Sequence, residues 1–187
     1  MPRITPVNPE TATGKAKDLL TAVKSKMGMV PNMMATLANA PAVLESYLSF
    51  SGALNGASLN AKTREAIAIA IAEANGCNYC LSAHSVIGKG AGLSDAEITA
   101  ARTGTSSDAK LGAILRLARA INTSRGFATD ADLKTARAAG ITDAEILEVV
   151  ATVSLNIFTN YINHVSDPTI DFPVIKSNTR TPELAGV

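Results

Sequence analysis

The sequence has few cysteines and little net charge, and each shortage removes a class of protein. Only two of the 187 residues are cysteine, too few to hold together a small secreted fold. Lysine and arginine number 17 against 16 acidic residues, and no block of like charges could follow a phosphate backbone or an anionic membrane surface. Tryptophan and a glycine-rich nucleotide loop are also missing, although these two absences set few limits on a substrate. We therefore expect no nucleic-acid partner.

Targeting and membrane-spanning patterns are missing as well. The first ten residues, MPRITPVNPE, lack the basic-then-apolar pattern of a secretory signal. The long apolar stretch near the C-terminus contains Glu148, Asn156, Asn160 and Asn163, unlike a membrane span. These patterns predict a cytoplasmic protein with no membrane partner.

What the chain does have is apolar residues in helix-length segments. Hydrophobic residues make up 47% of the sequence, enough for one core, so we predict a single domain over residues 1–187. Glycines end successive segments and predict about eight helices. Asn8, followed by proline, is typical of a cap that opens a helix to about Met27. Pro41 likewise opens a helix to about Leu54, and a short helix fits at 32–39.

Two further helix starts carry a recognisable cap. Ser94 and Thr142 each have a glutamate three residues later, and this capping box satisfies the free amides of a helix start. We expect a helix to begin at each.

One run challenges the helical interpretation. Residues 66–72 alternate alanine with isoleucine at the period of a strand. Alanine favours helices, and the run lies in a segment of about sixteen residues, from Asn60 to Asn75, which is long for a strand. No other segment could pair with a lone strand. We therefore predict an all-α fold in which this helix is central and apolar on all sides.

Both ends of the chain are expected to be extended. The first eight or so residues and the tail from Ser166 to Val187 are rich in proline and lack helical periodicity. One interpretation is frayed ends. The other is that the tail wraps over the body or over a neighbouring subunit, since its apolar residues, among them Ile170 and Phe172, would be costly to leave in water.

The two cysteines lie three residues apart and are followed by a histidine. On a helix that begins after Gly76, Cys77, Cys80 and His84 fall at i, i+3 and i+7 and share one face. Both cysteines would lie in the first turn, where free amides and the helix dipole stabilise the reactive thiolate. His84, one turn beyond Cys80, could take a thiol proton or pair with the charged sulfur.

Glu65 in the preceding helix is the fourth member of this group. If the two helices fold back at Gly76, Glu65 lies about 16 Å and His84 about 12 Å from the corner, within side-chain reach of each other. A carboxylate there could orient the imidazole and raise its basicity.

Peroxide chemistry fits a cysteine pair of this kind. Peroxide converts a thiolate to a sulfenic acid, and a second thiol nearby turns the sulfenic acid into a disulfide. On a regular helix the two Cβ atoms would be about 5 to 6 Å apart, whereas a disulfide needs about 3.5 to 4.5 Å. We therefore expect closure to distort the first turn and to give a strained, easily reduced disulfide.

Other interpretations of these residues stay open. The cysteines could be small buried hydrophobes, and His84 and Glu65 ordinary polar residues. Zinc is the main rival, because Cys77, Cys80, His84 and Glu65 could supply four ligands, although structural zinc usually draws its second ligand pair from a separate segment. A thioredoxin-type domain is excluded, because its cysteine motif follows a strand of a βαβ unit.

The spacing of Glu65, Cys77, Cys80 and His84, within EAIAIAIAEANGCNYCLSAH, closely resembles the core signature of the carboxymuconolactone decarboxylase superfamily. The nearest branch is the AhpD-like alkyl hydroperoxidases, and the likeness runs from about residue 32 to 173, the expected domain core, and includes the stretch 160–164. The resemblance implies an all-helical oligomer, a trimer or hexamer, with peroxidase activity. It makes Cys80 the peroxidatic cysteine, Cys77 the resolving one, His84 the base and Glu65 its partner in a proton relay.

Two details refine the resemblance. Some AhpD members have a histidine between the two cysteines, where this chain has Tyr79, so any role of that histidine is not carried over. Decarboxylases of the family typically lack the cysteine pair, which disfavours decarboxylation.

Two hypotheses follow from the sequence. In the first, the chain is a thiol-dependent alkyl hydroperoxide reductase that uses no cofactor or metal and is recycled by an external dithiol, a lipoyl group or a thioredoxin-like protein. Methionine, isoleucine and alanine near the active helix would line an apolar pocket and favour alkyl over inorganic peroxide. In the second, the chain is a non-catalytic helical oligomer with a Cys/His metal site.

Overall fold

The computed structural model describes residues 1–179, and its regular secondary structure over that range is entirely helical. The predicted all-α class is confirmed, with nine α-helices in the described residues rather than about eight. The helices are α1 (Gly14–Met27), α2 (Asn32–Leu37), α3 (Pro41–Ala53), α4 (Ala61–Ala74), α5 (Asn78–Gly90), α6 (Asp95–Arg102), α7 (Ala109–Thr123), α8 (Asp130–Ala138) and α9 (Asp143–Ser166), with a short 3-10 helix at Leu54–Gly56.

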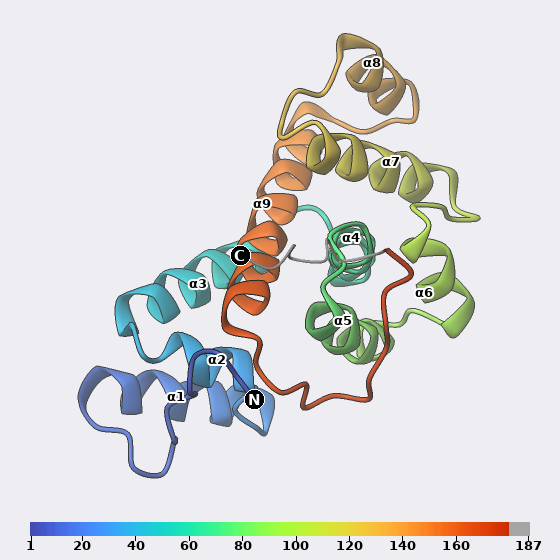
Figure 1. Ribbon diagram of the computed structural model, residues 1–187. Helices are drawn as coiled ribbons and strands as arrows, with labels where there is room; N and C mark the ends of the chain where they lie inside the picture. The colour runs from blue at the N-terminus through green and yellow to red at the C-terminus, as the bar shows by residue number, and fades with distance from the viewer. Residues whose placement is uncertain (180–187) are drawn as a thin grey trace, which may run out of the picture.

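Helix α4 occupies the middle of the molecule (Figure 1), packed against α5, α6, α7 and α9. The alternating run at 66–72 is helical and fully buried, because small alanines let neighbouring helices approach and the isoleucines fill the space between them. The side chain of Asn60 caps α4 by accepting the N–H of Thr63 at 2.9 Å. The prediction of a central helix with apolar residues all round is confirmed.

The other helix starts follow their local chemistry, with one exception. Both predicted capping boxes, at Ser94 and Thr142, are present, and a third at Thr129 opens α8. The predicted helix start at Asn8 is wrong. The Asn8 side chain instead accepts the N–H of Glu10 in a turn, and α1 begins only at Gly14, whose φ of 55° lies in the left-handed region.

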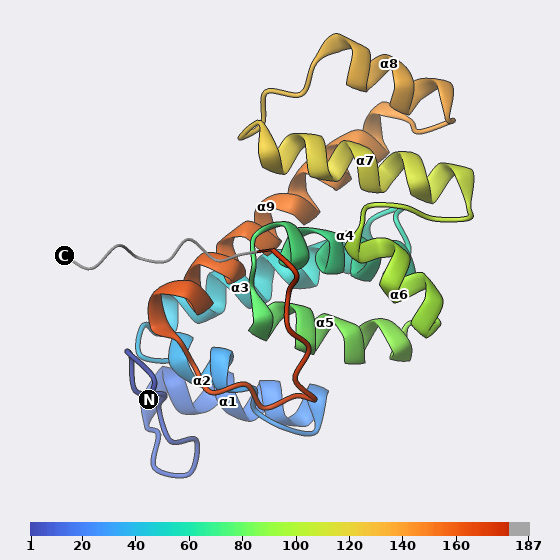
Figure 2. The same cartoon turned by 45° about the vertical axis from the view of Figure 1, so that its right-hand side comes forward.

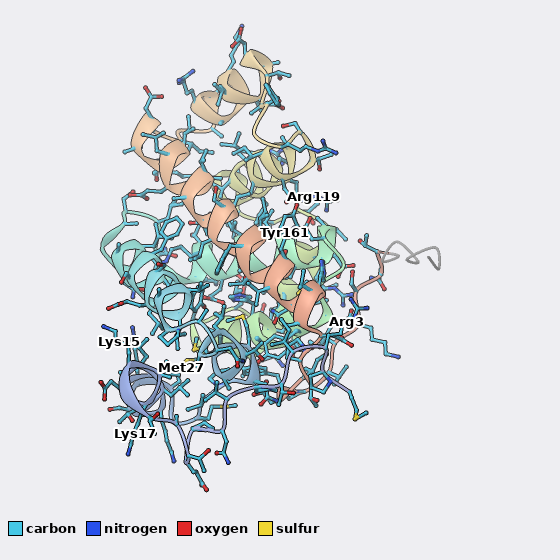
Figure 3. The ribbon with its side chains drawn as sticks, turned by 60° about the vertical axis from the view of Figure 1, so that its left-hand side comes forward. Arg3, Lys15, Lys17, Met27, Arg119 and Tyr161 are labelled. Carbon is cyan, nitrogen blue, oxygen red and sulfur yellow. The ribbon has the colours of Figure 1, made fainter. Side chains whose placement is uncertain are left out.

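The N-terminal residues lie against the far end of α9. The first eight residues form no helix or strand, and they bend at residues 3–4. Arg3 lies beside the C-terminal end of α9 (Figure 3), and its backbone N–H donates to the carbonyl of Ser166 at 2.8 Å. This contact ties the start of the chain to the end of its longest helix.

Residues 167–179, the C-terminal strap, cross the molecule after α9. The strap passes α2 and then crosses α5 (Figures 1 and 2). Its backbone donates to the Ser82 hydroxyl from Ile175 at 2.9 Å and to the carboxylate of Glu73 from Asn178 at 2.7 Å. Of the two interpretations of the tail, the structure supports wrapping over the body for residues 167–179, and the rest of the tail, 180–187, lies outside the described residues.

Glu73 anchors the far end of the strap. Its buried carboxylate pairs with Arg102 at 2.7 Å, and Arg102 in turn donates to the carbonyl of Lys176 at 2.9 Å. Burial alone would raise the pKa of Glu73, but Arg102 and the strap donors outweigh burial and lower that pKa. The strap is therefore held by a buried charge pair as well as by its apolar side chains.

Within residues 1–179, none of the helices combines the length and the hydropathy that a membrane crossing requires.

Candidate active site

The two cysteines lie at the turn between α4 and α5. Gly76 adopts a φ of 69°, in the left-handed region, and this turn leaves Cys77 with extended backbone just before α5. Cys77 is therefore the N-cap of α5, and its sulfur accepts the N–H of Cys80 at 3.4 Å. Both residues are free thiols, and both are buried.

This geometry corrects one expectation. Cys77 is not in the first turn of a regular helix, because α5 begins one residue later, at Asn78. Its sulfur lies over the free amides of the helix start, the usual place of a capping oxygen. The distance argument for two cysteines on a regular helix therefore does not apply here, and the strained disulfide stays a prediction.

Glu65 and His84 form the predicted pair. Oε2 of Glu65 lies 2.8 Å from Nδ1 of His84, and each side chain is about one-fifth exposed. Close packing of α4 on α5 permits this contact: a Cβ built on Gly88 would lie 3.7 Å from Cβ of Glu65. The carboxylate accepts the Nδ1 proton of the imidazole, which orients the ring and leaves Nε2 for chemistry.

Helix α9 supplies contacts to Cys80 that the sequence analysis missed. Nδ2 of Asn163 donates to the Cys80 sulfur at 3.1 Å, and the hydroxyl of Thr159 lies 4.0 Å from the same sulfur. Asn160 accepts a hydrogen bond of 2.8 Å from Asn75 at the end of α4. In the sequence these residues are polar positions at helical spacing within a mostly apolar segment. Only the fold shows that they are buried and face the cysteines.

The surroundings shift the pKa values of the two thiols in opposite directions. Burial disfavours the Cys80 thiolate, but the Cys77 hydrogen bond and the charge of His84 outweigh it. Together with the side-chain amides of Asn163 and Asn160, they lower the pKa of Cys80 to about 6. The hydrogen bond to Cys80, together with burial, raises the pKa of Cys77. The site therefore favours one thiolate, on Cys80, with the proton kept on Cys77.

The imidazole beside this thiolate is held in its charged form. Burial by itself would lower the pKa of His84, but the Glu65 carboxylate and the charge of Cys80 raise it above its ordinary value. The arrangement therefore favours the charged forms of both side chains, a Cys80 thiolate and a His84 imidazolium.

Loss of the Asn163 amide is expected to make Cys80 less acidic. In a pH titration followed by thiolate absorbance in the ultraviolet, the wild-type midpoint should lie at about 6. Asn163→Leu should raise the midpoint by about one to two pH units, because a hydrogen bond to a charged group contributes about 1.5 to 3 kcal/mol. Asn156→Leu is the matched control, since the Asn156 amide donates to the carbonyl of Thr152 in its own helix. An unchanged midpoint in Asn163→Leu would contradict this role.

A small apolar cavity of about 40 Å³ lies against Cys80 and His84. Its walls come from α2, α3, α5, α9 and the strap, and they include methionine, alanine and isoleucine side chains, as the sequence predicted. The lining residues are Pro31, Met33, Met34, Tyr47, Tyr79, Cys80, Ala83, His84, Ile87, Thr159 and Phe172. A separate, more polar cavity of about 100 Å³ includes Glu65 and Arg64 in its lining and also reaches His84.

The four residues do not assemble as metal ligands. In the part of the chain that the structure describes, no group of three or more His, Cys, Asp and Glu side chains is placed to hold a metal ion. Glu65 contacts His84, and Cys77 contacts the helix start. The zinc alternative therefore lacks a ligand set within these residues.

Comparisons with known proteins agree with this description. Residues 41–123, which contain all four predicted residues, match the model of the carboxymuconolactone decarboxylase family. No curated protein matches the sequence significantly.

Among solved structures, the chain resembles the AhpD core of an uncharacterized peroxidase-related protein from Ralstonia eutropha JMP134, with 22% identity, a TM-score of 0.80 and coverage of 91% of this chain and 92% of that one. It also resembles an uncharacterized peroxidase-related protein from Silicibacter sp. TM1040, with 21% identity, a TM-score of 0.75 and coverage of 90% and 88%.

A third similar structure is a cysteine-to-alanine variant of the debrominase Bmp8 in complex with 2,3,4-tribromopyrrole, at 20% identity, a TM-score of 0.77 and coverage of 90% and 91%. At these identities the solved structures establish the fold, which is shared by proteins of different chemistry. The family match over residues 41–123 and the shared helical fold both support the resemblance to the carboxymuconolactone decarboxylase superfamily and to its AhpD-like members.

Proposed function

We propose that the chain is a thiol peroxidase, in which Cys80 attacks a hydroperoxide and Cys77 resolves the product. The observation that carries the proposal is the acidic Cys80 thiol, held by Asn163 and placed beside the Glu65–His84 pair at the edge of an apolar cavity. A buried thiolate next to a supported imidazole is the arrangement that nucleophilic cysteine chemistry requires.

The first step would break the O–O bond. The Cys80 thiolate attacks one peroxide oxygen, the electron pair of the O–O bond leaves on the other oxygen, and His84 supplies the proton that completes the alcohol. Cys80 becomes a sulfenic acid, while Glu65 stabilises and orients the imidazole throughout.

The second step would regenerate a reducible pair. The Cys77 thiol attacks the Cys80 sulfenic acid, a disulfide forms and water leaves. Cys77 is placed for this role because its sulfur accepts the Cys80 backbone N–H at 3.4 Å. The neighbouring Cys80 sulfur raises the pKa of Cys77, and the charge of the Cys80 thiolate is lost when Cys80 is oxidised. An external dithiol, such as a lipoyl group or a thioredoxin-like protein, then reduces the disulfide by exchange.

The direct test is steady-state turnover with a small dithiol in place of the natural donor. With dihydrolipoate and hydrogen peroxide, the wild-type protein should oxidise one dithiol for each peroxide consumed, at a rate proportional to protein concentration. Consumption no faster than in a protein-free control would refute the proposal. Retention of zinc in a native mass spectrum would favour the rival metal site.

We also propose that the chain assembles as a homo-oligomer, a trimer or a hexamer. Several large apolar residues of α9 remain exposed, among them Leu147 at 69%, Tyr161 at 62% and Val165 at 64%. Tyr161 is labelled on this helix in Figure 3. Apolar residues gathered along one helix are typical of a contact surface.

Light scattering should therefore give the mass of a trimer or a hexamer at micromolar concentration. Leu147→Glu combined with Val165→Glu should shift the mass toward a monomer, because the charges would have to be buried in the contact. A monomer for the wild-type protein would contradict the proposal.

A further inference from the structure

We propose that Phe172 of the C-terminal strap sets the size of the substrate, and that the site takes compact hydroperoxides, namely hydrogen peroxide and those with a short alkyl group. This inference rests on the proposed function, and it departs from the expectation from sequence that the apolar pocket favours alkyl over inorganic peroxide, which stays a prediction. Phe172 is a specificity-determining residue in this account.

The space beside Cys80 is small. The cavity that reaches the Cys80 and His84 side chains measures about 40 Å³. A buried water needs about 10 to 15 Å³ of such space, so the cavity holds about three water-sized groups. Hydrogen peroxide or methyl hydroperoxide fits within that limit, whereas a cumyl group with its aromatic ring does not.

Phe172 is the part of the cavity wall that could set this limit on substrate size. Most of the lining comes from helices that belong to the packed core, including Met33 of α2, Ala83 of α5 and Thr159 of α9. Phe172 belongs instead to the irregular strap, and its ring meets the ring of Tyr79 edge-on with centroids 5.9 Å apart. Removal of the Phe172 ring would enlarge the cavity without cutting a helix.

Hydrogen bonds of the strap on both sides of Phe172 hold this residue in place. On one side, Asp171 accepts the Tyr79 hydroxyl at 2.7 Å and the backbone N–H of Asn32 at 2.7 Å. On the other side, Ile175 donates to Ser82 at 2.9 Å. Since the strap is fastened to α2 and α5 on both sides of Phe172, the ring is a fixed wall in this structure.

The experiment compares kcat/KM for hydrogen peroxide and for cumene hydroperoxide, with dihydrolipoate as reductant. Wild-type protein should prefer hydrogen peroxide, and Phe172→Ala should raise the value for cumene hydroperoxide by about tenfold or more while that for hydrogen peroxide changes little. Phe172→Leu should fall between them. Val174→Ala is the control, since Val174 lies on the strap, is 61% exposed and does not line the cavity. Equal use of both peroxides by the wild type, or an equal change in both for Phe172→Ala, would overturn the inference.

A second readout separates this inference from the proposed function. In a Cys77→Ser background, Cys80 is the sole thiol, and its alkylation needs no peroxidase activity. Phe172→Ala should speed labelling by N-phenylmaleimide about tenfold more than labelling by iodoacetamide. If no peroxide is consumed but this difference appears, the proposed function fails and the size limit stands. If both reagents respond equally, the size limit fails.

Discussion

Cys80→Ser should abolish hydroperoxide consumption, whereas Cys77→Ser should retain a single turnover. The reason is that the structure makes the cysteines unequal: Cys80 has the lowered pKa and the Asn163 donor, and Cys77 keeps its proton. His84 lies one helical turn beyond Cys80 on α5, whereas Cys77 precedes the helix as its N-cap, so proton transfer also favours Cys80.

Sulfenic acid trapping measures this difference. After one equivalent of hydrogen peroxide, Cys77→Ser should form a dimedone adduct on Cys80, because no second thiol resolves the sulfenic acid. Wild-type protein, treated alike, should give little adduct. If Cys80→Ser forms the adduct and Cys77→Ser does not, the two roles are reversed.

His84→Ala should slow the reaction of Cys80 with peroxide by about a hundredfold or more, the usual contribution of a positioned acid or base. The substitution removes both the proton donor to the leaving oxygen and the charge that lowers the pKa of Cys80. Glu65→Gln should have a smaller effect, because the imidazole stays and loses only its charged partner. Stopped-flow measurement of the single turnover gives each rate directly.

The pH dependence of the same rate provides an internal check. Because the thiolate is the reactive form, the wild-type rate should rise as the pH increases through about 6, and it should fall again at higher pH, where His84 loses the proton that it supplies. In His84→Ala, the rise should move to higher pH. The other histidine of the chain, His164 on α9, is the matched control, and His164→Ala should keep most of the rate. Equal losses for the two histidine variants would indicate a structural effect.

The sequence predicted much of the fold because its local signals agree with the global packing. Capping boxes at Ser94 and Thr142, and an apolar run too long for a strand, were enough for the helical class and the central helix. The predicted helix start at Asn8 was wrong because the Asn8 side chain accepts the backbone N–H of Glu10 and forms a turn there. Composition does not decide between this turn and a helix cap. The single-domain assignment stays a prediction.

The candidate site, too, could be predicted only in part from the sequence. Glu65 and His84 come from adjacent helices joined by a short turn, so helix geometry alone could place them together. The exact place of Cys77 depended on the φ of Gly76, which moved it from the first turn to the cap. Asn163 and Phe172 follow Cys80 by more than eighty residues, and only the packing of α9 and the strap on α5 brings them to the cysteines.

The most direct test of the account is the intact mass of the protein after one equivalent of hydrogen peroxide without reductant. The account predicts a loss of two hydrogens, mapped by peptide digestion to a bond between Cys77 and Cys80, and its complete reversal by dihydrolipoate. An unchanged mass, or an added oxygen that persists on Cys80 of the wild-type protein, would contradict the central claim that these two cysteines form a working redox pair.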